Sequence, residues 1–418
     1  MSWETVKLGD IATCIQPGPF GSQLHNSDYS ESGTPIIMPK DMIDGKISHS
    51  NLIFVGEEHT KRLCRHQVHA GNLMVARKGD VRKCVFITEN EEGWMTGSDC
   101  LKVALNEGTC YPRFIYYQLR SPFIGRWLEK ISIGATMPSI NTGLLSSIEL
   151  VLPPLKEQKQ IADILSAYDN LIENNQKQIK LLEEAAQRLY KEWFVDLHFP
   201  GYENTKIVDG VPEGWERKTV LDCLEMHIGG GWGKESPVGK NTLKGKVIRG
   251  TDINDIKAGK YTDIPFRFHT ENDIKNRALK PNDIVFELSN GNINNIGRCL
   301  LIDDLILKNC GENTICASFC KLFRPLDRVH ALTLYWEIQD MQLSGRMFPF
   351  KKQGSNGINN FAFEEFLSYE LLIPNNDTLL KPIEDIMLKM SNIQNQFALL
   401  IQARDRLLPK LMSGEVEV

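Results

Sequence analysis

Two long stretches of the chain repeat core-type residues every seven positions, and this pattern constrains the fold more than any other feature. The first stretch runs from about residue 157 to residue 193, and its stripe alternates steps of four and three: Ile161, Leu165, Tyr168, Ile172, Asn175, Ile179, Leu182, Ala186, Leu189 and Trp193. The second runs from about residue 382 to residue 411, and its stripe alternates in the same way: Ile383, Ile386, Met390, Ile393, Phe397, Leu400, Arg404, Leu407 and Leu411. Because 3.5 residues per turn keeps one stripe facing a partner helix, the sequence predicts a coiled coil.

The rest of the chain is duplicated. Residues 1–156 and 205–378 align as two copies of one module, and their ends agree best. The first copy opens with Trp3-Glu4 and closes with segment 149–153, while the second opens with Trp215-Glu216 and closes with segment 370–374. Three internal matches accompany these ends: 75–77 with 285–287, 83–87 with 298–302, and 139–141 with 357–359. A period above 200 residues indicates tandem domain duplication and excludes a solenoid.

Within a module, short β-rich runs alternate with turns that contain Gly, Pro and Asn. In the first copy the expected strands are 35–38, 73–75, 83–87 and 148–152, and a helix is expected near 112–130, with proline in its first turn. The predicted fold class is therefore α+β. It has two tandem mixed α/β modules, separated by two long helices that form an antiparallel coiled coil with pseudo-two-fold symmetry. The predicted domains are 1–154, 155–198, 199–376 and 377–418, with segment 196–213 linking into the second module.

The antiparallel direction follows from where a domain's ends lie. Compact domains often have their termini close together, so the second module should return the chain to the place where it left. The second helix then runs back along the first, which is roughly 55 Å long at 1.5 Å per residue. The modules would sit at opposite ends, and the end of the second helix would lie near Met1. Asn175 falls on the stripe, and it is either buried, where it would fix the register, or exposed to solvent.

Composition places the chain among cytoplasmic globular proteins. Its 418 residues are 42% hydrophobic and 24% charged, and no apolar run approaches the roughly 18 residues that a membrane span needs. The ten cysteines lack tight spacing and no export signal is visible, so reduced thiols are expected. The net charge of −5 argues mildly against nucleic-acid binding. However, segments 59–88 and 240–280 carry local charges of +6 and +5, and local charge decides phosphate binding.

No catalytic or metal motif is visible. The Gly-rich segment 229–235 lacks the spacing of a phosphate loop, and the equivalent Gly/Pro segment 16–22 suggests a shared turn instead. Four cysteines, Cys299, Cys310, Cys316 and Cys320, lack the paired spacing of a zinc site and are expected in the core. His59, His66 and His69 are expected to enlarge a basic surface. We therefore expect a protein without catalysis, without a metal and without a cofactor of its own.

Three segments resemble the specificity subunit of type I restriction–modification systems. The strongest is Leu152-Pro-Pro-Leu-Lys-Glu-Gln-Lys-Gln-Ile-Ala-Asp-Ile-Leu165, which is similar to that family's junction between a target-recognition domain and its conserved helix. Segment 189–201 resembles the end of that helix, and segment 404–415 resembles the family's C-terminal ending. The second junction, from Ile373 onward, lacks the Pro-Pro and Glu-Gln signature.

The resemblance implies a non-catalytic, DNA-binding subunit. Each module would be a target-recognition domain that reads one half of a split, asymmetric target. The helices would dock two methyltransferase (modification) subunits, and restriction and translocase subunits would join them. S-adenosylmethionine, ATP and magnesium would then belong to those partners.

Candidate DNA contacts come from the basic segments and from loops rich in amide side chains. Arginine suits guanine, and asparagine or glutamine suits adenine. In the first module the candidates are Lys61, Arg62, Arg65, Arg77, Lys78, Arg82 and Lys83. In the second module they are Arg249, Asn290, Asn292, Asn294, Asn295, Arg298, Lys351, Lys352 and Gln353. The competing interpretations are that the basic segments are ordinary solvated surface and that the Asn/Gly runs are only turns.

A structural adaptor with two protein-binding modules is the alternative function, and the acidic net charge favours it. Salt dependence separates the two, because counterion release weakens DNA binding steeply as salt rises. The sequence leaves the target bases, the spacing of the two halves and the methylated base undetermined.

Overall fold

The fold is described from a computed structural model that covers residues 3–134, 137–261, 263–354, 357–375 and 377–418. The chain forms two compact units: residues 1–170 with 401–418, and residues 171–400. Each unit holds one module together with parts of both long helices. The predicted domain boundaries at 154, 198 and 376 divide the chain by element, and they stay predictions; residue 376 lies outside the described residues.

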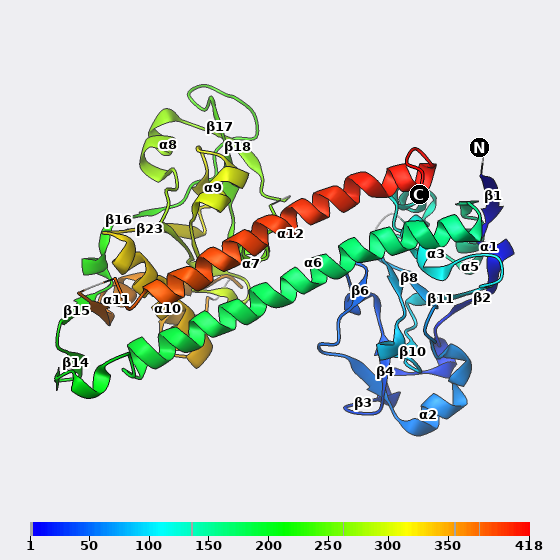
Figure 1. The fold of residues 1–418 in the computed structure, drawn as a ribbon, viewed down its shortest axis with the longest axis horizontal. Helices are drawn as coiled ribbons and strands as arrows, with labels where there is room; N and C mark the ends of the chain where they lie inside the picture. The colour runs from blue at the N-terminus through cyan, green and yellow to red at the C-terminus, as the bar shows by residue number, and fades with distance from the viewer. Residues whose placement is uncertain (1–2, 135–136, 262, 355–356, 376) are drawn as a thin grey trace. The chain divides into compact units, whose positions relative to one another are not determined.

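The first unit is built on antiparallel strand pairs (Figure 1). Its main sheet has the order β2 (Ala12–Pro17), β11 (Cys100–Leu105), β8 (Leu73–Ala76) and β9 (Cys84–Phe86). A second sheet has the order β10 (Met95–Thr96), β4 (Thr34–Ile37), β7 (Ile53–Val55) and β3 (Tyr29–Ser30), with β10 parallel to β4. The ends of the module meet where β1 (Glu4–Lys7) pairs with β12 (Glu149–Leu152), and β5 (Met42–Ile43) and β6 (Lys46–Ile47) form a hairpin.

The second unit repeats the main sheet and the closing strand pair of the first unit, and its second sheet keeps three of the four strands. Its main sheet has the order β16 (Leu224–Gly229), β23 (Cys320–Pro325), β19 (Ile284–Glu287) and β21 (Cys299–Leu301). The strand β17 (Leu243–Ile248) lies between antiparallel β18 (Phe266–His269) and parallel β22 (Ile315–Cys316). The module closes where β15 (Trp215–Thr219) pairs with β26 (Glu370–Pro374). The expected duplication is confirmed, and so are the four strands expected in the first copy.

The hydrogen-bond ladders correct two of the internal matches. Cys84 pairs with Val75, and Cys299 pairs with Phe286, so Val75 corresponds to Phe286 and not to Val285. The amide of Ile140 donates to the carbonyl of Arg77, and the amide of Phe361 donates to that of Leu288, each at 2.9 Å. Ile140 therefore corresponds to Phe361, three residues beyond the predicted match. The backbone hydrogen bonds between strands determine which positions correspond, and identical residues nearby in the sequence do not.

The single helix expected over 112–130 is wrong in detail, because the structure has α3 (Pro112–Leu119) and α4 (Pro122–Ile131). Pro122 cannot donate a backbone hydrogen bond, and the Ser121 hydroxyl caps the new helix by accepting from the amide of Ile124. The other module helices are α1 (Leu8–Ile11), α2 (Glu57–Arg62), α5 (Thr142–Ser146), α7 (Ile253–Lys257), α8 (Glu271–Arg277), α9 (Asp304–Cys310), α10 (Arg328–Ser344) and α11 (Phe363–Leu367). The remaining strands are the hairpin β13 (Ile207–Val208) and β14 (Val211–Pro212), and the small sheet β20 (Ser289–Asn290), β25 (Asn359–Phe361) and β24 (Lys351–Lys352).

Both long helices are present, as α6 (Leu155–Tyr190), which continues into a π-helical turn (Lys191–Val195), and α12 (Lys381–Ser413). In the first unit, Ile161 and Leu165 near the start of α6 share a core with Leu411 near the end of α12. In the second unit, Ala186 and Tyr190 near the end of α6 share a core with Ile383 near the start of α12. The helices therefore pair in opposite directions within each unit, as expected.

The stripe residues of both helices are buried or half-buried. Asn175 is 7% exposed, so the buried alternative holds for it, and within the described residues its amide nitrogen has no hydrogen-bond partner. None of the helices in the part of the chain that the structure describes combines the length and the apolar character that crossing a bilayer requires.

An ion pair explains the arginine on the stripe of α12. The Arg404 guanidinium lies 2.8 Å from the carboxylate of Asp169 on α6. The Tyr117 hydroxyl of α3 donates to the same carboxylate at 2.7 Å. Both charged side chains are mostly buried, at 19% and 14% exposed. One carboxylate thus joins both long helices to the first module.

We expect Arg404→Ala to lower the free energy of unfolding by about 3 kcal/mol, because it leaves a buried carboxylate without its cation. Urea denaturation of the full chain measures this change. Arg406→Ala is the matched control, since Arg406 is exposed on the same helix. Equal effects of the two substitutions would contradict the structural role of the pair.

The two ends of the chain meet in the first unit. A Cβ built on Gly414 would lie 3.1 Å from the ring of Trp3. The end of the second long helix is expected near Met1, which lies outside the described residues. The contact with Trp3 shows that this helix end lies near the first described residue.

A circular permutant that joins the termini and opens the β13–β14 turn between Asp209 and Gly210 should fold, because both residues are exposed. Circular dichroism should show unchanged helix content and a cooperative thermal transition. A second permutant, opened between Gln178 and Ile179 inside α6, should lose that transition. If both permutants unfolded alike, the meeting of the ends would not explain the fold.

Candidate nucleic-acid interface

A glycine turn occurs at the same place in both modules. The amides of Gly18 and Gly230 donate to the carbonyls of Cys100 and Cys320, at 3.1 and 3.0 Å. A Cβ on Gly18 would lie 2.0 Å from a backbone oxygen, and one on Gly230 would lie 2.1 Å from another. Only glycine fits such a close approach, so the shared turn expected from the sequence is confirmed.

Two residues after each glycine, a large aromatic side chain faces solvent. Phe20 is 52% exposed and Trp232 is 39% exposed. The Arg77 guanidinium lies 5.4 Å from the centre of the Phe20 ring, and the Arg267 guanidinium lies 4.8 Å from the centre of the Trp232 ring. Of these four residues, only Arg77 is among the candidates predicted from the sequence. Aligning Gly18 with Gly230 would have placed Phe20 opposite Trp232.

Several predicted cations of the first module surround its turn. Arg62 donates to the carbonyl of Gln23 at 2.9 Å, and Gln16 donates to the carbonyl of Arg65. Arg77 thus lies over the Phe20 ring and Arg62 holds the chain three residues further on, while the backbone of Arg65 contacts Gln16 just before the turn. The nearby predicted lysines have acidic neighbours: Lys61 pairs with Glu57 at 2.7 Å and Lys78 pairs with Asp99 at 3.2 Å.

Arg82 and Lys83 lie elsewhere in the first unit, on a cavity of about 640 Å³ that Arg120 and Arg126 also line. Arg82 is held by Asp80 at 2.9 Å and Glu129 at 3.2 Å. Lys83 donates to the carbonyl of Pro39 at 2.9 Å. The structure therefore divides the predicted cations of this module into two groups.

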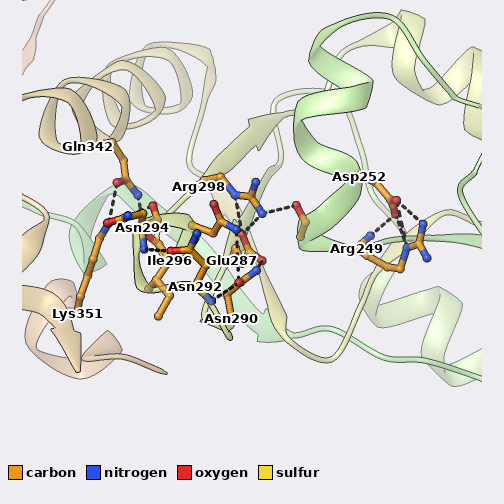
Figure 2. A network of polar contacts seen from close by, with 12 residues as sticks. Arg249, Asp252, Glu287, Asn290, Asn292, Asn294, Ile296, Arg298, Gln342 and Lys351 are labelled. Atoms are coloured by element: carbon orange, nitrogen blue, oxygen red, sulfur yellow. Dashed lines mark hydrogen bonds and ion pairs between the residues drawn. The ribbon is translucent and has the colours of Figure 1, made fainter. Parts of the chain in front are cut away.

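In the second module, two predicted arginines hold the fold together (Figure 2). Arg249 forms an ion pair with the buried Asp252 at 2.6 Å, and that hydrogen-bonded carboxylate raises the pKa of the guanidinium. Arg298 lies 2.8 Å from the buried Glu287 and donates to the carbonyl of Gly250 at 3.0 Å. Arg298 corresponds to Lys83, which bonds the equivalent carbonyl in the first module.

The asparagine loop is a set of turns, as the simpler interpretation held (Figure 2). The side-chain oxygen of Asn290 accepts from the amide of Asn292 at 2.7 Å, and that of Asn292 accepts from the amide of Asn294 at 3.0 Å. Asn290 also donates to Glu287, and Asn295 donates to Asn290. The side-chain oxygens of Asn290 and Asn292 are therefore used within the turns, and a base contact through either oxygen would have to share or replace an internal bond.

The remaining predicted residues of the second module lie on and beside β24. Lys351 donates to Gln342 at 3.1 Å, Lys352 reaches Glu365 at 3.4 Å, and Gln353 is exposed. All three stay candidates for DNA contact.

Beside Trp232 the surface is hollowed into a cavity of about 590 Å³. Phe319 and Ile358 form much of its apolar wall, and they are 60% and 40% exposed. Arg249 and Asn290 line the same cavity. Two predicted site residues and the exposed tryptophan are thus brought together.

The expectation that three histidines enlarge the basic surface is wrong for His66. It is 4% exposed, and burial lowers its pKa, so the ring is neutral at pH 7. The other two have acidic partners, since His59 lies 3.7 Å from Asp28 and His69 lies 2.6 Å from Glu92.

The four cysteines of the second module, Cys299, Cys310, Cys316 and Cys320, are buried free thiols, as expected. Across the described residues, no three His, Cys, Asp or Glu side chains gather in a way that could hold a metal ion.

Arg298→Ala should lower the free energy of unfolding by about 3 kcal/mol, because Glu287 would stay buried without its cation. The double variant Glu287→Ala with Arg298→Lys copies the residues of the first module, Ala76 and Lys83. It should recover most of the loss, and urea denaturation of both variants measures the difference. A double variant less stable than Arg298→Ala would show that the two modules use this position differently.

Comparisons with known proteins agree with this architecture. Residues 1–184 match the family model described as the type I restriction modification DNA specificity domain. The type I restriction enzyme MjaIX specificity subunit of Methanocaldococcus jannaschii is 23% identical, over 100% of this chain and 94% of the relative. The chain is therefore similar to type I restriction–modification specificity subunits, over its first 184 residues in the family model and along its whole length in the MjaIX relative.

The chain is also similar to two further specificity subunits. The EcoKI specificity subunit of Escherichia coli is 20% identical over 73% of this chain and 66% of its own length. The crystal structure of the S subunit from M. genitalium covers 98% of this chain and 96% of its own, at 14% identity and a TM-score of 0.55. That likeness shows a shared fold.

Proposed function

We propose that this chain is a specificity subunit that reads a bipartite, asymmetric DNA target, with one half recognised by each module. The observation that carries the proposal is the duplicated turn, in which an arginine guanidinium lies over an exposed aromatic ring in each of the two modules. The two surroundings differ in residue and charge, and unlike surfaces read unlike sequences.

Phosphate contacts are assigned to the exposed cations. In the first module these are Lys61, Arg62, Arg65, Lys78 and Arg82, and in the second they are Lys352 and, beside it, Gln353 as a polar contact. Exposed side chains can exchange a weak surface ion pair for a phosphate at little cost. Arg249, Arg298 and Asn290 have structural bonds, so we assign them to shaping the surface.

We further propose that the chain is the non-catalytic subunit of a larger enzyme. The helices would dock two methyltransferase subunits, and restriction and translocase subunits would complete the assembly. S-adenosylmethionine, ATP and magnesium would be bound by those subunits. The Pro-Pro-Leu-Lys-Glu-Gln junction is a rigid place for such docking, because Gln158 is buried and bonds both the Tyr111 amide and the Pro153 carbonyl.

Exchanging residues 1–150 for those of a relative should change one half of the recognised sequence and leave the other half unchanged. Sequencing of methylated sites, in cells that carry the parent or the chimaera, measures both halves. A chimaera that kept both halves would contradict the assignment of one module to one half-site.

Binding should weaken steeply between 50 and 200 mM salt if phosphate contacts supply the affinity, by on the order of 10³-fold for six or more contacts. A protein-binding adaptor with an apolar interface would show little change. Fluorescence anisotropy of a labelled duplex across this salt range separates the two functions.

A further inference from the structure

Phe20 and Trp232 occupy equivalent places in two modules whose turns share little sequence. The first turn reads Gln16-Pro-Gly-Pro-Phe-Gly and the second reads Ile228-Gly-Gly-Gly-Trp-Gly. Both turns keep a glycine at which a Cβ atom would clash with a backbone oxygen, and both then present a large aromatic ring to solvent. Neither ring belongs to an apolar core among the described residues. The stability of the fold therefore does not explain why an aromatic residue stands at either position.

A guanidinium group lies over each ring. In the first module it belongs to Arg77, and Arg62 bonds the carbonyl of Gln23 three residues beyond Phe20. In the second, Arg267 stacks on Trp232, Arg277 donates to the carbonyl of Gly229 at 3.0 Å, and Arg249 lines the adjoining cavity. An apolar ring with cations on its rim fits a ligand that combines flat apolar faces with negative charge. Base pairs between phosphates have that chemistry.

The polypeptide holds these rings firmly. Each turn is anchored by the glycine amide bonded to the main sheet, and a stacked guanidinium limits the rotation of each ring. A rigid apolar side chain on a protruding turn can enter a groove and separate neighbouring bases.

We propose that Phe20 and Trp232 are DNA wedges, each of which enters a groove at its own half-site and stacks against an unstacked base. The inference rests on the proposed function and adds a distortion of the duplex to it. Flexible pyrimidine–purine steps favour such an insertion, so the wedges select sequence through deformability as well as contact.

The two wedges differ in their surroundings. Phe319 extends the apolar wall beside Trp232. Its counterpart in the first module is Asp99, because both residues precede the equivalent cysteines Cys100 and Cys320, and Asp99 pairs with Lys78. The second module therefore offers the larger apolar surface to an unstacked base.

The test uses the full chain assembled with its methyltransferase subunit, and a duplex selected by that complex from a randomised pool. Single 2-aminopurine substitutions through both half-sites report unstacking as a rise in fluorescence. We expect Trp232→Ala to weaken binding by roughly tenfold, as loss of one aromatic base contact does, and to abolish the rise at one half-site. Phe20→Ala should do the same at the other half-site. Trp232→Phe should keep most of both signals.

Phe123→Ala and Phe348→Ala are the matched controls, since these rings are 71% and 66% exposed in the first and second units. The wedge proposal is overturned if the parent complex raises the fluorescence at no position, or if Phe20→Ala and Trp232→Ala bind like the controls. Failure of the parent complex to select any sequence would instead contradict the proposed function. Thermal melting of each variant shows that its fold is intact.

Discussion

The burial of the end of α12 in the core of the first unit is the constraint on which the rest of the structure depends. Leu411 is fully buried beside Ile161 and Leu165, although some 250 residues separate them along the chain. The last turns of α12 complete the apolar core that the start of α6 shares with the first module. Burying such side chains contributes about 1.5–3 kcal/mol each, so this contact stabilises the unit. The antiparallel direction of the helices follows from it.

The duplication is the second constraint on the structure, because both modules use the same strand framework with different residues on its loops and strand ends. Lys83 and Arg298 bond equivalent carbonyls, but only Arg298 faces a buried carboxylate. The second module has its own asparagine turns and an apolar cavity beside its exposed tryptophan. A constant framework with variable edges explains how one chain can hold two recognition surfaces of different character.

Much of the framework was predictable from the sequence, since the seven-residue stripe, the module ends and the antiparallel direction depend on periodicity and on matching segments. The details that failed depend on bonds that a sequence does not display. Register slipped by one residue at Val75 and by three at Ile140, because ladders fix it. Pro122 divided an expected helix. Of the candidate site, Arg77 lies over the exposed Phe20 ring, whereas Arg298 and Asn290 bond the buried Glu287, and a sequence does not show that a buried carboxylate will claim their side chains.

The shared core of the first unit also orders events during synthesis. Residues 401–418 complete that unit, and they follow the 230 residues of segment 171–400. At about 5–20 residues per second, a ribosome needs roughly 10–50 s to make that segment. During this interval the apolar start of α6, including Ile161 and Ala162, lacks the part of its cover that α12 supplies. The nascent chain therefore exposes part of an apolar helix face while segment 171–400 is translated. Early binding of a chaperone or of another subunit to this face would protect the chain from aggregation.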